Sequence, residues 1–205
     1  IRELLHPAVA GKPLQESACH PWHQACASSL KPPKYNPKEA KRLLAEAGLA
    51  KGFPLSILSW GEARGAAEAV AGQLRKVGIR AKVNYQPFRG FLKARRVGSP
   101  LIVTLWDNAV GQPDVDNTAS YFFLPGARNY NKDKRLLKAV MAGRAEIDLK
   151  KREAIYRKAF DLVTKEHYIM PLIPIPAVVL HNKRVKMLRG HKNPKGFQFN
   201  RIVWN

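Results

Sequence analysis

The stretch PLSILSWGEARGAAEAVAGQLRKVGIRAKVNYQ, residues 54–86, decides the fold class because it predicts a strand, a helix and a second strand in succession. The second strand alternates apolar with basic or polar residues from 79 to 86. Between the strands, an apolar stripe predicts a helix over about 63–77, and Gly78 ends it. Because the connections are short, we expect the two strands to be parallel, with a right-handed crossover.

The flanking sequence extends this pattern in both directions. Asn36 and Pro37 predict the start of a helix that Gly48 ends. The run LIVTLW, residues 101–106, is typical of a strand buried on both faces. A helix after the second strand (Phe88, Phe91, Leu92) and two later helices, about 132–142 and 148–166, complete the prediction. The sequence therefore predicts an α/β fold, a mixed sheet flanked by helices.

Composition limits what the chain can be. Its 205 residues suffice for one domain with an appendage, and 45% are hydrophobic, enough for a core. No apolar run approaches the ~18 residues that span a bilayer. The chain carries 36 Lys and Arg against 15 Asp and Glu, a formal charge of +21. Such a field attracts anions, so a basic nucleic-acid-binding protein is the alternative hypothesis, although no helix-turn-helix, zinc-finger or RNA-binding signature is present.

Two motifs raise questions of chemistry. The stretch CHPWHQAC contains Cys19, His20, His23 and Cys26, and could be a metal site, a redox motif or a stapled loop. The acids Asp107, Asp114 and Asp116 follow the 101–106 strand and could act as paired carboxylates or line a polar loop. Ligands of α/β folds bind at the carboxyl ends of parallel strands, which favours the second interpretation. We therefore expect that the protein is not an enzyme and that it holds neither a cofactor nor a metal ion.

Four segments in sequence resemble a known family. YNPKEAKRLLAEAGL (35–49) resembles a "tyrosine, Asp or Asn, proline, then a helix ending in Leu-Leu-x-x-Ala-Gly" segment of the extracellular solute-binding proteins of family 5. These are dipeptide, oligopeptide and nickel receptors of ABC importers. Residues 67–83, 151–175 and 183–204 are similar to later segments of that family, so roughly residues 31–205 resemble its C-terminal portion.

The resemblance implies a periplasmic-binding-protein-like lobe truncated from a larger bilobal protein. It implies a loop-rich lead-in with a disulfide hairpin over 1–35, an α/β second lobe over 36–182, and a return segment over 183–205 toward the missing N-terminal lobe. The function it implies is the substrate-binding component of an ABC importer, which binds a peptide-like small solute in an interlobe cleft and delivers it to the membrane permease. We expect a periplasmic, or extracellular and membrane-associated, location.

The resemblance also indicates where the ligand binds. In the dipeptide receptors, the loop after the third strand reads "tryptophan, x, glycine, aspartate, x, glycine, aspartate, proline, aspartate". Trp106, Gly111, Pro113 and Asp114 match this pattern, but Ala109 replaces the aspartate that pairs with a ligand's amino terminus. The dipeptide-specific chemistry is therefore not expected.

We predict that Trp106 offers an apolar face to the ligand, and that Asp107, Asn108 and Asp114 supply polar contacts. Arg64, at the start of the second helix, is the nearest candidate for an anionic ligand group. Because an exported receptor matures in an oxidising compartment, we expect Cys19 and Cys26 to form a disulfide.

Overall fold

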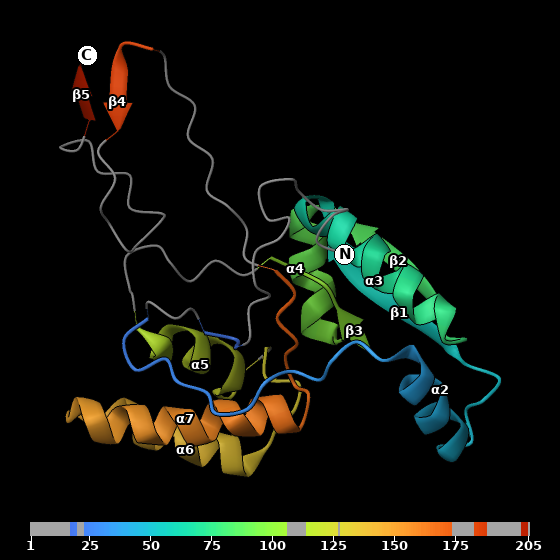
Figure 1. Cartoon of the computed structure of the whole chain (residues 1–205), viewed down its shortest axis with the longest axis horizontal. Coiled ribbons are helices and arrows are strands. Elements are labelled where there is room, and N and C mark those ends of the chain that lie inside the picture. The colour runs from blue at the N-terminus through green and yellow to red at the C-terminus, as the bar shows by residue number, and fades with distance from the viewer. Residues whose placement is uncertain are drawn as a thin grey trace. The chain divides into compact units, whose positions relative to one another are not determined.

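The computed structural model describes residues 17–19, 23–105, 114–126, 128–173, 183–187 and 202–204 (Figure 1). These residues form two compact units. The first unit comprises the described residues of 33–106 and 125–130. The second comprises those of 13–32, 107–124 and 131–205. Within the described part of the chain, no helix is long and apolar enough to cross a membrane.

A three-stranded sheet is the centre of the first unit. Strand β1 (Pro54–Trp60) lies between β2 (Arg80–Gln86) and β3 (Leu101–Ile102), and both neighbours run parallel to it. The short turn η2 (Gly61–Ala63) and helix α3 (Arg64–Lys76) connect β1 to β2. The predicted strand–helix–strand unit and its parallel pairing are therefore confirmed.

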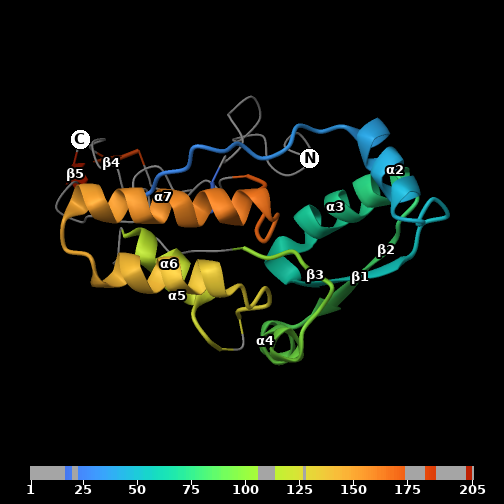
Figure 2. The same cartoon turned by 90° about the horizontal axis from the view of Figure 1, so that it is seen from below.

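Helices cover both faces of this sheet. Figure 2 shows α3 and α4 (Phe88–Val97) on opposite sides of the strands. Buried Ala67 and Ala71 of α3 supply small side chains, which let the helix pack closely on β1, where Ile57 is fully buried. On the other side, the Trp60 ring lies 4.8 Å from the ring of Phe88. The predicted third helix is thus confirmed, and it closes the second face of the sheet.

The third strand is shorter than the apolar run predicts. Strand β3 has two residues, Leu101 and Ile102, although the Val103 N–H still donates to the Leu58 carbonyl at 3.0 Å. Residues 103–105 lie outside the strand, and Trp106 lies outside the described residues. Among residues 101–105 only Val103 is buried and Thr104 is exposed, so the prediction of a strand buried on both faces is wrong. The strand ends where its pairing with β1 ends.

The first unit begins with helix α2 (Pro37–Glu46), as predicted. The Asn36 side chain accepts a hydrogen bond from the Glu39 N–H at 3.0 Å, which caps the first turn. No residue of α2 is buried, and Leu43 is half exposed. Local capping and proline placement, rather than packing within the unit, therefore define this helix.

The second unit is a bundle of α5 (Val115–Phe123), α6 (Lys134–Ala145) and α7 (Leu149–Lys165). Helices α6 and α7 match the two predicted late helices. Helix α5 was not predicted, because its first residues are acids and amides that also suit a loop. The sequence feature that indicates this helix is the spacing of Val115, Ala119 and Phe123, which lie four residues apart and are all buried in the structure.

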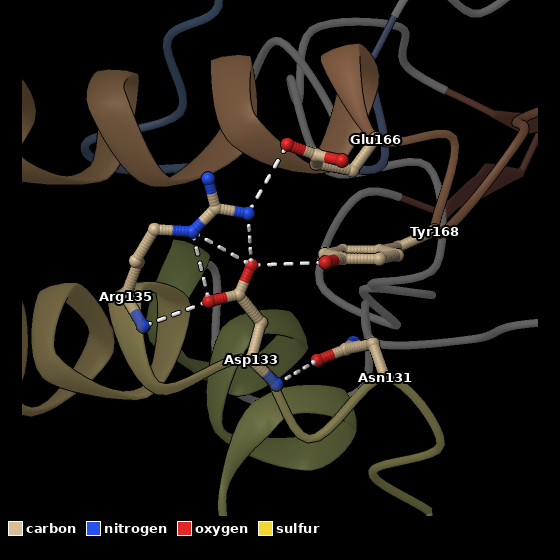
Figure 3. Close-up of polar contacts among 5 residues, drawn as sticks. All are labelled: Asn131, Asp133, Arg135, Glu166 and Tyr168. Carbon is tan, nitrogen blue, oxygen red and sulfur yellow. Dashed lines mark hydrogen bonds and ion pairs between the residues drawn. The ribbon is translucent and has the colours of Figure 1, made fainter.

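A polar cluster joins the start of α6 to the residues that follow α7 (Figure 3). Asp133 caps α6 by accepting from the Arg135 N–H at 2.8 Å. The Tyr168 hydroxyl donates to Asp133 Oδ2 at 2.9 Å, and Arg135 Nη2 donates to Glu166 Oε1 at 3.1 Å. The Arg135 hydrogen bonds, with that from Tyr168, hold the pKa of the Asp133 carboxyl far below its usual range.

The lead-in segment is fixed to this bundle. Cys19 and Cys26 form a disulfide, and Cys19 is fully buried in the core of the bundle. The predicted disulfide is confirmed. Further along, Asp161 of α7 accepts hydrogen bonds from the Ser29 and Leu30 N–H groups at 2.7 and 3.0 Å. The segment is therefore held both by its covalent closure and by a carboxylate of the longest helix.

The end of the chain contains a small antiparallel pair of strands, β4 (Val185–Met187) and β5 (Ile202–Trp204). These strands are extended, as predicted for 183–205, and the segment between them lies outside the described residues. The assignment of 1–35, 36–182 and 183–205 to the lobes of a larger receptor stays a prediction.

Candidate functional site

The carboxyl ends of the three parallel strands meet at one edge of the sheet, because parallel strands share a direction. Trp60 ends β1, Gln86 ends β2, and residues 103–105 follow β3. The Trp60 indole Nε1 donates to Thr104 Oγ1 at 3.1 Å, which joins the ends of β1 and β3. In α/β folds, this is the edge at which ligands bind.

An aromatic cluster lies at this edge. The Trp60 ring is 4.8 Å from the Phe88 ring and 6.4 Å from the Phe91 ring, with tilted planes in both pairs. Phe91 is buried, but Phe88 is 52% exposed. The cluster thus exposes the Phe88 ring to solvent, while the buried Phe91 supports it from the interior. The sequence analysis did not name Trp60 or Phe88 as candidate site residues, although Trp60 ends a strand just as Trp106 ends the predicted third strand.

Arg64 lies at the same edge, at the first position of α3. Its guanidinium carbon is 5.1 Å from the centroid of the Tyr85 ring, near the end of β2. The Tyr85 hydroxyl donates to Glu68 Oε1 at 2.9 Å. Burial and the hydrogen bond to Glu68 raise the pKa of Tyr85, so this phenol stays protonated and donates.

The positive charge of the Arg64 guanidinium is not neutralised by an acidic side chain of the described residues. Among the described residues, Arg64 forms no ion pair, and it is an exposed residue. No side chain caps the N-terminus of α3, where backbone N–H groups carry partial positive charge. Arg64 and the helix terminus therefore offer two sources of positive potential at one edge of the sheet.

Asp114, the other described member of the predicted site, belongs to the second unit. Its side chain caps α5 by accepting from the Asp116 N–H at 2.7 Å. Arg152 of α7 donates to both carboxylate oxygens, Nη1 to Oδ2 at 2.6 Å and Nη2 to Oδ1 at 2.7 Å. Burial alone would raise the pKa of Asp114, but the hydrogen bonds from Arg152 and the Asp116 N–H outweigh it and lower that pKa.

Arg152 is held on three sides. Its Nε donates to the Gly143 carbonyl at 3.1 Å, and its guanidinium carbon is 5.0 Å from the centroid of the Tyr156 ring. Its side chain is only 12% exposed. In the sequence, Arg152 interrupts the apolar stripe of α7. A charged residue at such a position indicates that it pairs with a buried or partly buried acid.

Asp116 is also engaged in the second unit. It accepts from the buried Tyr156 hydroxyl at 2.6 Å and from Ser120 Oγ at 2.7 Å, while Arg144 lies 3.7 Å away. Burial, followed by the hydrogen bond to Asp116, raises the pKa of Tyr156 well above its usual value. Both Asp114 and Asp116 therefore anchor α5 to its neighbouring helices.

The remaining predicted contacts, Trp106, Asp107 and Asn108, lie outside the described residues, and their roles stay predictions. Across the described ranges, no group of three His, Cys, Asp or Glu side chains is arranged to hold a metal ion. His20 of the CHPWHQAC motif lies outside those ranges, and both of its cysteines form the disulfide.

Comparison with known proteins defines the class. The family model described as "Bacterial extracellular solute-binding proteins, family 5 Middle" matches residues 8–130. The chain belongs to this family of solute-binding proteins, which confirms the resemblance found in its sequence. The family's members are receptors for solutes rather than enzymes.

Particular relatives agree with this assignment. The chain is 31% identical over 138 residues to the "Dipeptide-binding protein" of Escherichia coli, covering 61% of this chain and 26% of that protein. It is 25% identical over 169 residues to the "Di/tripeptide-binding protein 2" of Pseudomonas aeruginosa, covering 77% and 31% respectively. The chain thus spans between a quarter and a third of the length of these relatives.

Solved structures show the same fold. The periplasmic binding protein DppA of Helicobacter pylori, in complex with the peptide STSA, superposes with a TM-score of 0.74 at 22% identity, covering 93% of this chain and 39% of that one. The dipeptide-binding protein of Pseudoalteromonas sp. SM9913, in complex with Met-Leu, gives a TM-score of 0.67 at 22% identity, covering 78% and 34%. The predicted periplasmic-binding-protein-like fold is confirmed.

Proposed function

We propose that this chain is part of the substrate-binding component of an ABC importer, which takes up a peptide-like solute. The relatives named above are dipeptide- and di/tripeptide-binding proteins, which supports this ligand class. The receptor would hold the solute in an interlobe cleft and deliver it to a membrane permease. Its place would be the periplasm, an oxidising compartment in which the Cys19–Cys26 disulfide is stable.

The observation that carries the proposal is the composition of the carboxyl edge of the sheet. It combines a partly exposed aromatic surface, Trp60 with Phe88 on the α4 side of the sheet, and an exposed arginine at a helix N-terminus, Arg64 on the α3 side. A peptide has both apolar side chains and a terminal carboxylate. Aromatic faces bind the former, and a guanidinium binds the latter through two parallel hydrogen bonds.

The ligand contacts predicted from the sequence for residues 106–114 are part of the proposal as well. Trp106 would pack on the ligand, while Asp107 and Asn108 would fix its orientation. Asp114 would bind the ligand's polar groups from the end of the loop. Its Oδ1 accepts from both Arg152 and the Asp116 N–H, whereas its Oδ2 accepts from Arg152 and has a second lone pair for a ligand N–H.

The role of Arg64 is tested by a thermodynamic cycle on the whole receptor. Calorimetric titration would compare a peptide with its C-terminal amide, first on the native protein and then on Arg64→Gln. We expect amidation to weaken binding to the native protein by tenfold or more, about 1.4 kcal/mol, and to have little effect on the variant. Lys76→Gln, at the exposed far end of α3, is the matched control and should behave like the native protein.

Trp106 has its own test. If it contacts the ligand, Trp106→Ala should reduce affinity by tenfold or more, about 1.4 kcal/mol. If Trp106 only contributes to the core, the variant should melt at a lower temperature and its folded fraction should bind with native affinity. A melting curve recorded beside the titration separates the two results, and failure of every peptide to bind the native receptor would reject the function itself.

A further inference from the structure

A stretch of the first unit carries basic charge without any acid. Residues 69–106 contain eight Lys and Arg and no Asp or Glu. This stretch forms most of α3, all of β2 and α4, and strand β3. Its charge is therefore not neutralised by neighbours in the sequence, and the fold decides where that charge lies.

The strand register places part of this charge on the α4 side of the sheet. The Trp60 ring packs on Phe88, so the Trp60 side of β1 faces α4. Parallel pairing sets Trp60 beside Gln86 and Ser56 beside Lys82. Because side chains alternate between the two faces of a strand, Arg80 and Lys82 lie on the α4 side. Figure 2 shows that α3 lies on the opposite side.

Helix α4 adds three more bases on this side. Arg89, Lys93 and Arg96 are spaced by four and three residues, so they form one stripe, and this stripe lies opposite the buried Phe91. All three side chains are exposed. Val97, at the end of the helix, is 88% exposed. We name Arg80, Lys82, Arg89, Lys93 and Arg96 together the basic face.

The basic face differs from the other charged surfaces of the chain. No member of it forms an ion pair with a described residue; Arg80 donates only to the Lys51 carbonyl, at 3.1 Å. By contrast, the exposed Arg42 pairs with Glu39 and Glu46, and Arg157 pairs with Glu153. The positive potential of the basic face is therefore not cancelled within the described part of the molecule.

We propose that the basic face docks on the anionic headgroups of a lipid bilayer. A bilayer surface offers many mobile negative charges, so it suits an exposed array of bases that surrounds no pocket. Lys and Arg near such a surface each add to the attraction, and the exposed Val97 can enter the boundary between headgroups and acyl chains. The family is extracellular, which favours a membrane surface over nucleic acid as the anion this face meets.

Vesicle binding tests the proposal with the 205-residue chain. Sedimentation with vesicles of phosphatidylcholine that contain phosphatidylglycerol should bring down the native chain, and vesicles of phosphatidylcholine alone should not. The variant R89Q/K93Q/R96Q should bind the anionic vesicles about 100-fold more weakly, because three charges near the surface are removed. Circular dichroism should show that this variant is folded.

A control of equal charge distinguishes a docking face from net charge. The variant K150Q/K151Q/K158Q removes three exposed lysines from α7, and it should lose less than tenfold in affinity. Equal losses for the two variants would overturn the proposal, because binding would then follow total charge. Binding to neutral vesicles, or binding to soluble polyglutamate with no binding to vesicles, would also overturn it.

Discussion

Arg152 of α7 donates hydrogen bonds to both carboxylate oxygens of Asp114, at 2.6 and 2.7 Å. Because Asp114 is the N-cap residue of α5, this pair connects the start of α5 to a helix that begins 35 residues later in the sequence. The pair is partly buried, since the arginine side chain is 12% exposed and the aspartate side chain is 30% exposed. Its two parallel hydrogen bonds give it a defined geometry. The end of the predicted ligand loop is thus fixed by a side chain from outside that loop.

Arg152→Met should destabilise the fold. The substitution leaves a partly buried carboxylate without its partner, and we expect a loss of about 2 kcal/mol in the free energy of unfolding, below the 3–5 kcal/mol of fully buried pairs. Urea unfolding measures it. Arg157→Met is the matched control on the same helix, because its pair with Glu153 is about half exposed on both sides and should cost about 0.5 kcal/mol or less. Equal losses would contradict this account of the Asp114 pair.

The Asp114 charge should make stability depend on pH. The folded-state pKa of Asp114 is lowered, so its contribution is present above the unfolded pKa of about 3.9 and is lost as the pH falls through the folded value. Asp114→Asn keeps an oxygen for the Asp116 N–H but removes the charge. The stability difference between native protein and variant should be largest near neutral pH and shrink in acid; a constant difference would show that the charge is not involved.

Two glycines in helices should respond oppositely to alanine. A Cβ at Gly143 would lie 2.7 Å from Tyr156 Cζ, and the Tyr156 ring is held by its hydrogen bond to Asp116 and by Arg152. Gly143→Ala should therefore destabilise by about 1–2 kcal/mol, despite the gain in helix propensity. A Cβ at Gly72 of α3 would meet no atom within 4 Å, so Gly72→Ala should stabilise by about 0.5–1 kcal/mol. Thermal unfolding of both variants compares them, and equal signs would contradict the packing described for Gly143.

Removal of the disulfide should destabilise the second unit. The bridge joins residues seven positions apart, and closing such a loop gives about 2–3 kcal/mol by the chain-entropy relation. The variant C19A/C26A should lose about this amount, with a further loss because Cys19 is fully buried. Thiol counting of the denatured, unreduced native chain should find no free thiol. Two free thiols would contradict the bridge.

The elements that could be predicted from sequence alone are those that carry their own local signals. Asn36 and Pro37 start α2, Gly78 separates α3 from β2, and the alternation from 79 to 86 defines a strand, whatever lies around them. The family resemblance had the same basis, because it depended on short ordered segments. The disulfide followed from the spacing of the two cysteines together with the compartment that the resemblance implied.

Tertiary structure decided what depends on partners far away in the sequence. The 101–106 run predicted a longer strand than β3, since pairing with β1 and not hydrophobicity sets its end. Helix α5 exists because Val115, Ala119 and Phe123 are buried in a core that α6 and α7 supply. Likewise, the sequence around Asp114 predicts an unpaired acid in a loop, whereas the fold pairs it with Arg152, which is 38 residues away in the sequence. Local propensity is encoded in neighbouring residues, whereas burial and ion pairing are properties of the packed chain.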